Sequence, residues 1–263
     1  MPADVVDYKI TGDDMQMVEI ELDPDESVRA EAGTMMYMGP GIEMDTNLGA
    51  KEGQGLGGAI FGGLKRAFTG ESFFITNFKH TGTGKGHVAF SAPYPGKIIP
   101  LELGELGGEF ICQKDAFLCA ANGIDIDIAF TKRLGAGFFG GEGFILQRLT
   151  GDGRAFIHAG GTIIKKELAA GETWRVDTGC LVGMTPSVDY DIRMMKGVRN
   201  ALFGGEGIFL ANLEGPGIVF LQSLPFSRLA DRMSAATHQN RGESKGVAGV
   251  GGDLLGGLLG GDR

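Results

Sequence analysis

The sequence predicts a mainly β protein: three related β-sandwich or hairpin units in a pseudo-threefold, barrel-like prism, followed by a short C-terminal helix. Three observations predict this class: runs that alternate apolar and polar residues, glycine turns between the runs, and an internal repeat. Alternation is strict in residues 124–128 and 188–192, as expected for strands with one buried face. Glycine provides 47 of the 263 residues, which supplies many sharp turns.

The repeat is clearest where a Gly-Glu pair precedes an apolar run, a glycine turn and a second apolar run. The three glutamates of these pairs are Glu71, Glu142 and Glu206. The glycine turns that follow them lie at residues 84–86, 151–153 and 215–217. Because two apolar runs joined by a short glycine turn are typical of a β-hairpin, we expect one hairpin in each copy.

A second repeated element precedes each of these pairs of runs. Residues 26–33 align without gaps to residues 172–179, and residues 109–115 form a looser copy. We therefore expect three repeats, at about residues 20–103, 104–168 and 169–224. Three related β-units in one chain favour stacking around a pseudo-threefold axis.

The chain ends in two different segments. Phe226, Leu229, Ala230 and Met233 follow helical spacing, which predicts a helix at about residues 226–238. We expect residues 1–240 to form one domain. The Gly-Leu segment that follows, residues 241–263, is expected to be a mobile tail, because ordering glycine costs much backbone entropy.

Composition excludes several classes of protein. The formal net charge is −9, which argues against nucleic acid as a partner. Three cysteines cannot build a disulfide framework, and we expect them to be buried thiols in a reducing cytoplasm. The N-terminus lacks the apolar segment of a secretory signal, and no apolar run is long enough to span a membrane. We therefore expect a cytoplasmic protein.

No constellation of side chains predicts catalysis, a cofactor or a metal site. His80 and His87 lie on either side of one glycine turn, but a metal would need a third or fourth ligand. The cysteines form no Cys-x-x-Cys pair, and none has an evident base. The glycine-rich segment 53–58 lacks the βαβ context of a dinucleotide site. We expect no enzymatic activity and no cofactor.

The repeated carboxylates Glu71, Glu142 and Glu206 allow two interpretations. Around a threefold axis they would form a ring that binds a cation or shares protons. Alternatively, each carboxylate accepts backbone N–H groups at its own glycine turn. The sequence leaves both open.

Each repeat also carries a basic pair close to aromatic residues, which predicts a loop that contacts a partner. These residues are Lys65, Arg66 and Phe68, then Lys132, Arg133 and Phe139, then Lys196, Arg199 and Phe203. Clustered cations beside apolar groups suit an anionic membrane surface, a protein partner or an oligomer face. The alternative is that the phenylalanines pack in the core and the cations are ordinary solvated charges.

The Gly-Glu pairs, the turns at residues 32–33 and 178–179, and the glycine-rich segment 53–63 resemble the "altered inheritance of mitochondria" family, formerly a domain of unknown function. The resemblance covers about residues 5–235. It implies a fold like that of the tryptophan RNA-binding attenuation protein. It carries over no catalytic residue, and the family includes a mitochondrial member linked to inner-membrane organisation. RNA binding is not expected, since likeness of fold does not transfer a site.

We therefore expect a non-enzymatic oligomeric scaffold or assembly factor that acts through protein surfaces, with an anionic membrane as a candidate partner. The alternative is a small-ligand-binding module with a pocket between repeats. Because β-prisms leave strand edges that neighbouring chains can cover, we expect a closed cyclic homo-oligomer, with a trimer favoured.

Overall fold

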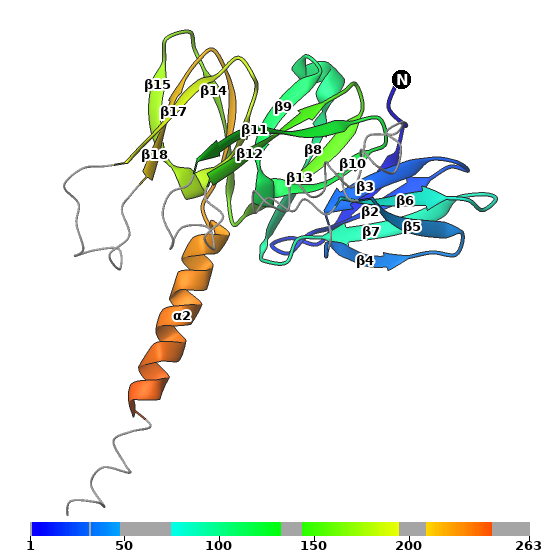
Figure 1. Ribbon diagram of the computed structural model, residues 1–263, viewed down its shortest axis with the longest axis horizontal. Coiled ribbons are helices and arrows are strands. Elements are labelled where there is room, and N and C mark those ends of the chain that lie inside the picture. Colours follow the sequence, from blue (N-terminus) through cyan, green and yellow to red (C-terminus); the bar gives the residue numbers. More distant parts are fainter. Residues whose placement is uncertain (1, 32, 48–74, 133–143, 195–208, 244–263) are drawn as a thin grey trace, which may run out of the picture. The chain divides into compact units, whose positions relative to one another are not determined.

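The computed structural model describes residues 2–31, 33–47, 75–132, 144–194 and 209–243 (Figure 1). The chain divides into two compact units, Met1–Pro225 and Phe226–Arg263. The first unit consists of four sheets whose strands all pair antiparallel, so the expectation of a mainly β protein is confirmed. The described strands close into no barrel, and the pseudo-threefold prism stays a prediction.

Eighteen of the described strands fall into three sets of six, preceded by β1 (Asp7–Thr11). The first set is β2 (Met17–Leu22), β3 (Ser27–Glu31), β4 (Met35–Met38), β5 (Ile42–Asn47), β6 (Ile75–His80) and β7 (Gly86–Ser91). The second set is β8 (Gly96–Glu102), β9 (Glu109–Gln113), β10 (Phe117–Ala121), β11 (Asp125–Lys132), β12 (Phe144–Thr150) and β13 (Arg154–Gly160). The third set is β14 (Ile163–Leu168), β15 (Thr173–Asp177), β16 (Leu181–Met184), β17 (Asp189–Met194), β18 (Phe209–Glu214) and β19 (Gly217–Gln222).

One pairing pattern recurs in every set. The first and third strands flank the sixth, which gives the half-sheets β2-β7-β4, β8-β13-β10 and β14-β19-β16. The second and fourth strands flank the fifth, which gives β3-β6-β5, β9-β12-β11 and β15-β18-β17. The pairing makes β8 the first strand of the second set and β14 the first strand of the third set. The sequence repeats instead place these segments at the ends of the first and second repeats.

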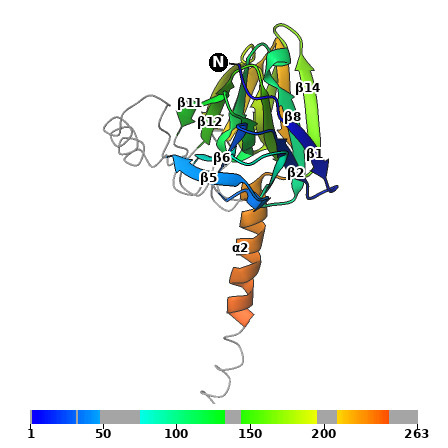
Figure 2. The same ribbon diagram turned by 90° about the vertical axis from the view of Figure 1, so that its right-hand side faces the viewer.

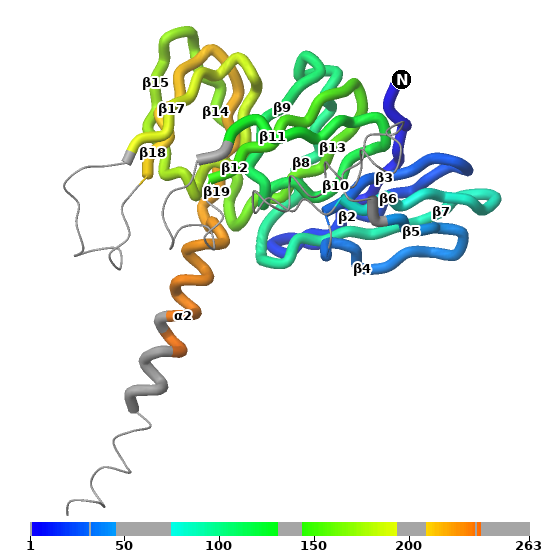
Figure 3. Tube along the Cα trace, in the orientation of Figure 1, coloured from blue at the N-terminus to red at the C-terminus, as the bar shows by residue number. Residues whose placement is uncertain are grey.

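The glycine turns do not form the hairpins that the sequence predicts. They connect β6 to β7, β12 to β13 and β18 to β19, and in each case the two strands belong to different sheets. Each turn is therefore a corner that carries the chain from one sheet to another (Figure 3). A short glycine turn permits either course, and here each strand finds its partners elsewhere, for example β6 with β3 and β5.

Two junctions join the three sets. The second strand of one set pairs with the third strand of the next, β3 with β10 and β9 with β16. These pairs create two six-stranded sheets, in the orders β5-β6-β3-β10-β13-β8 and β11-β12-β9-β16-β19-β14. A four-stranded sheet, β1-β2-β7-β4, and a three-stranded sheet, β15-β18-β17, remain (Figure 1). Strands β1 and β2 lie side by side in Figure 2.

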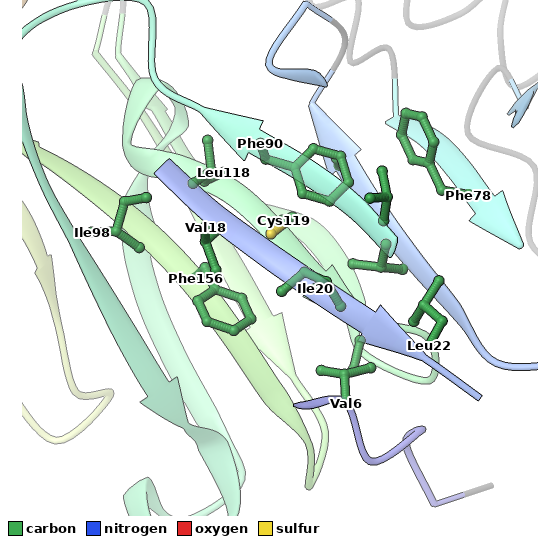
Figure 4. Close-up of a cluster of buried hydrophobic side chains, with 14 of the residues drawn as sticks. Val6, Val18, Ile20, Leu22, Phe78, Phe90, Ile98, Leu118, Cys119 and Phe156 are labelled. Carbon is green, nitrogen blue, oxygen red and sulfur yellow. The ribbon is translucent and has the colours of Figure 1, made fainter. Parts of the chain in front are cut away.

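Alternating apolar residues build the core. On β2, Val18, Ile20 and Leu22 are buried, while the residues between them are partly exposed. They belong to a buried cluster with Phe90 and Phe156 (Figure 4). Burying a side chain of this size stabilises the fold by about 1.5–3 kcal/mol. Similar clusters lie in the middle and last thirds of the unit.

The second unit contains helix α2 (Phe226–Glu243). The helix begins where the sequence predicts and runs five residues past the expected end at residue 238. Within it, the Thr237 hydroxyl donates to the Met233 and Ser234 carbonyls. Most of the expected tail, residues 244–263, lies outside the described residues.

Candidate functional site

Most of the residues predicted to contact a partner lie outside the described residues. These are Lys65, Arg66, Phe68, Arg133, Phe139, Lys196, Arg199 and Phe203, together with Glu71, Glu142 and Glu206. Lys132 is the last residue of β11, and its side chain is not described. The predicted residues outside the description fall in three segments, 48–74, 133–143 and 195–208. These segments connect equivalent strands, β5 to β6, β11 to β12 and β17 to β18. Their predicted roles and the carboxylate ring stay predictions.

The described residues place large apolar side chains on β4, the end strand of its sheet. Met36, Tyr37 and Met38 are 51%, 44% and 42% exposed. Among the described strands, only β7 pairs with β4, so the other edge of β4 has no strand beside it. Exposed methionine and tyrosine on a strand edge are typical of a contact surface.

The corresponding strands of the other sets show what such an edge looks like when it is covered. The third strand carries the same bulge in each set, immediately after Met35, Phe117 and Leu181. The bulge makes β10 residues 118–120 and β16 residues 182–184 the counterparts of Met36, Tyr37 and Met38. All six counterparts are buried. The difference is that β3 lies beside β10 and β9 lies beside β16.

Strand β15 is a second edge of this kind. Among the described strands only β18 pairs with it, and its Trp174 is 41% exposed. The second strand of each set pairs with the fifth strand of that set. When the three sets are aligned on these pairs, Val28 on β3 and Phe110 on β9 are the counterparts of Trp174. Both counterparts are fully buried at a junction between sets.

Polar neighbours hold Trp174 in one orientation. Its indole N–H donates to Glu172 Oε1 at 2.8 Å, and Lys166 Nζ lies 3.8 Å from its ring centroid. The hydrogen bond from Trp174 is the main cause that lowers the pKa of Glu172, followed by the backbone N–H of Ala169. A fixed aromatic side chain loses less conformational entropy when a partner covers it.

Tyr37 on the β4 edge is held in a similar way. Its hydroxyl donates to Glu19 Oε2 on β2 at 2.5 Å. This hydrogen bond is the main cause that raises the pKa of Tyr37. The side chain is therefore a neutral hydrogen-bond donor at neutral pH, with its ring left partly exposed.

The histidines do not form a joint site. His80 lies on β6 and His87 on β7, which belong to different sheets. His80 and His158 are buried, and the Nδ1 atom of each has no hydrogen-bond partner in the described part of the chain. Burial lowers the pKa of His158 to about 4, so this imidazole is neutral at neutral pH.

The cysteines are part of the packing. Cys112 and Cys119 are fully buried thiols, and Cys180 is partly exposed. Burial raises the pKa of Cys112 to about 12 and that of Cys119 well above its usual value. Such thiols are poor nucleophiles, because the thiolate is the reactive form.

No group of three or more His, Cys, Asp or Glu side chains in residues 2–31, 33–47, 75–132, 144–194 and 209–243 is arranged to hold a metal ion. In the same residues, no helix is both long and apolar enough to cross a membrane.

The sequence does not show which strands have an unpaired edge. The segments that become β3 and β15 align as repeats, so the sequence marks them as equivalent. Which copy of a repeated strand has a neighbour depends on the order of the sets along the fold. The one available signal is the polar indole N–H of Trp174, since the side chains at the equivalent positions, Val28 and Phe110, are wholly apolar.

Comparison with known proteins places the chain in a family. Residues 8–224 match the mitochondrial biogenesis AIM24 family. An uncharacterized protein of Streptococcus pyogenes serotype M6 is 32% identical over 216 residues, which cover 81% of this chain and 84% of that protein. The X-ray crystal structure of a Streptococcus pyogenes protein superposes with a TM-score of 0.68 at 28% identity, covering 88% of this chain and 99% of the other. The chain belongs to the mitochondrial biogenesis AIM24 family.

Proposed function

We propose that this protein is a non-enzymatic, self-associating scaffold or assembly factor that acts through its protein surfaces. One observation carries the proposal: β4 and β15 are end strands of the described sheets, their counterparts in both other sets have a neighbouring strand, and they carry the exposed large side chains Met36, Tyr37, Met38 and Trp174. Aromatic residues and methionine are enriched in protein interfaces, and natural proteins rarely leave such edges uncovered.

Five of the shifted pKa values have structural causes. His158, Cys112 and Cys119 are shifted by burial alone. Tyr37 and Glu172 are shifted chiefly by hydrogen bonds that orient side chains at the strand edges. None of these groups needs a reactive role to explain its environment, so they supply no argument for an enzyme.

We infer that the oligomer is a closed ring, with a trimer favoured. The recurrence of one pairing pattern supports a repeat relation between the three sets. The pseudo-threefold axis and the likeness to the tryptophan RNA-binding attenuation protein stay expectations from the sequence. An open edge at each end lets one copy contact the next through unlike surfaces, and such contacts generate rings when the rotation closes.

Light scattering coupled to size-exclusion chromatography tests the proposal. One chain has a mass of 27.7 kDa, and we expect about three times this mass at micromolar concentration. A monomer throughout the micromolar range would overturn self-association, and with it the proposed scaffold.

The remaining expectations from the sequence stay predictions. They are a cytoplasmic location, an anionic membrane or a protein as partner, no nucleic acid as partner, and the alternative of a ligand-binding module. A thermal-shift screen separates the last of these from a scaffold, since a ligand that binds the folded state raises the melting temperature.

A further inference from the structure

The two end sheets are complementary halves of the six-stranded sheets inside the chain. Each six-stranded sheet joins a half-sheet of fourth, fifth and second strands to a half-sheet of third, sixth and first strands. Sheet β17-β18-β15 is the first kind of half without its complement, and β4-β7-β2, with β1 beside it, is the second kind. If the two end sheets were joined through β15 and β4, the strand order would be the same as in the two six-stranded sheets.

The two internal junctions define the register of such a pair. At the first junction, Ala120 lies opposite Arg29, and at the second, Met184 lies opposite Ile111. The shared bulge makes Met38 the counterpart of Ala120 and Met184. Pairing with the fifth strand makes Arg175 the counterpart of Arg29 and Ile111, because Arg29, Ile111 and Arg175 lie opposite Asn77, Arg148 and Asn212.

Three further equivalences check this alignment. Asn77, Arg148 and Asn212 lie opposite Asp45, Asp127 and Asp191 on the fourth strands. An aspartate therefore recurs at one position of the fourth strand in all three sets. The same alignment places Tyr37 opposite Val176. This pair would be the counterpart of two internal pairs, Cys119 with Ala30 and Gly183 with Cys112.

We propose that β4 of one copy pairs antiparallel with β15 of a second copy, with Met38 opposite Arg175 and Tyr37 opposite Val176. This inference rests on the proposed self-association and names the strands that carry it. The pair completes a sheet of order β17-β18-β15-β4-β7-β2-β1 between copies. It covers Met36, Tyr37, Met38 and Trp174, whose counterparts are buried at the internal junctions.

The chemistry of the two edges suits this pairing. Directly opposite side chains of an antiparallel pair lie on the same face and in contact. The aliphatic part of Arg175 can lie along Met38, as long charged side chains do on apolar surface. Because β4 and β15 are different strands, each copy offers one edge to each of two neighbours, and assembly continues until a ring closes.

Charge substitutions at one opposite pair test the strands and the register together. Met38→Lys places a cation opposite Arg175, and we expect the dissociation constant of the assembly to rise at least about tenfold. Met38→Glu faces the same arginine with a carboxylate and should leave assembly intact. The double variant Met38→Lys with Arg175→Glu should restore it. Ile164→Lys, at a side chain 47% exposed on edge strand β14, is the matched control and should assemble normally.

The mass of each variant by light scattering decides between the outcomes, with circular dichroism used to select folded variants. Loss of assembly in Met38→Lys and its recovery in the double variant support the pairing. An oligomeric wild type whose Met38→Lys variant stays oligomeric overturns the pairing and leaves the proposed scaffold standing. Loss without recovery overturns Arg175 as the opposite residue. A monomeric wild type overturns the scaffold itself.

A cross-linking experiment does not depend on how well the charged variants fold. Met38→Cys and Arg175→Cys are made separately, each with Cys180→Ser to remove the partly exposed thiol. When the two proteins are mixed and oxidised, we expect a disulfide-linked dimer that neither protein forms alone. Absence of that dimer from the mixture overturns the register.

Discussion

At the scale of single residues, His158 shows how one position takes different chemistry in the three sets. Register makes Ser91, His158 and Gln222 equivalent, opposite Met17, Ile98 and Ile163. Gln222 accepts from the Gly160 N–H and donates to the Gly179 carbonyl. His158 instead packs edge-on to Tyr94, with ring centroids 4.6 Å apart, and its Nδ1 has no partner among the described residues.

The buried imidazole of His158 predicts a loss of stability in acid. Its pKa is about 4 when folded and 6.5 in the unfolded chain, so between these values only the unfolded state takes up the proton. The free energy of unfolding should fall as pH drops from 6.5 to 4, by on the order of 3 kcal/mol from this residue. Urea titrations across this pH range measure the fall.

His158→Gln provides the test of cause, because glutamine is the natural residue at the equivalent position 222. We expect this variant to lose most of the pH dependence between 6.5 and 4. Ile164→Gln, an exposed change on β14 that removes no titratable group, is the control and should keep the wild-type dependence. An unchanged slope in His158→Gln would assign the acid sensitivity to other groups.

The cysteines make a second prediction at this scale. Because burial raises the pKa of Cys112 to about 12 and that of Cys119 well above its usual value, neither thiol should react with iodoacetamide in the folded protein at pH 8. Mass spectrometry should find at most one modified thiol, at Cys180, and three in denaturant. Rapid modification of Cys112 under native conditions would contradict the described burial.

At the scale of elements, the junction between β9 and β16 depends on a glycine. A Cβ atom on Gly183 would lie 2.5 Å from Phe110 Cε1 and 2.7 Å from the Ile111 carbonyl oxygen. The counterpart of Gly183 is Tyr37 on the open β4 edge, where no described strand limits the size of the side chain. The covered strand therefore needs a small residue at a position where the open strand carries a large one.

Gly183→Ala should accordingly destabilise the fold by about 1–3 kcal/mol, since it overpacks a covered junction. The urea midpoint of unfolding measures the effect. Ile164→Ala, an exposed change on β14, should shift stability by less than about 0.5 kcal/mol and serves as the control. A Gly183→Ala protein as stable as the wild type would mean that Phe110 moves aside at little cost.

The glycine turns show where reading elements from sequence fails. Apolar runs and turns near residues 84–86, 151–153 and 215–217 are strands and connections, as expected. The prediction that each turn closes a hairpin is wrong, because the strands on either side enter different sheets. Local sequence specifies an extended run with a buried face, and the same buried face suits either of two facing sheets.

At the scale of the whole molecule, the three segments with basic and aromatic residues connect equivalent strands of the three sets. This equivalence gives the membrane hypothesis a direct test by sedimentation with anionic lipid vesicles. We expect binding that weakens with salt and is lost when Phe68, Phe139 and Phe203 are changed to serine in a folded protein. Absence of binding at low salt would reject a membrane partner and leave protein contacts.

The site could be predicted only in part. The β-rich repeats predict an oligomer that uses open strand edges, but the sequence points to loop residues such as Phe68 and Phe139 as the contact, and both stay predictions. The described residues direct attention instead to Met36, Tyr37, Met38 and Trp174, which the sequence does not distinguish from buried apolar residues. These side chains are exposed because β4 and β15 are end strands of their sheets, and no local sequence pattern encodes the place of a strand in its sheet.

The sequence by itself determined the mainly β class, the repetition, the position where the helix begins and the family, because periodicity, glycine turns and recurring motifs are local properties. The tertiary structure alone decided which strands pair, that the glycine turns are corners between sheets, and that β4 and β15, unlike their counterparts in the other sets, are end strands. The physical reason is that backbone hydrogen bonds between strands are made without regard to side-chain identity. Which strands become neighbours is therefore settled by the packing of whole sheets.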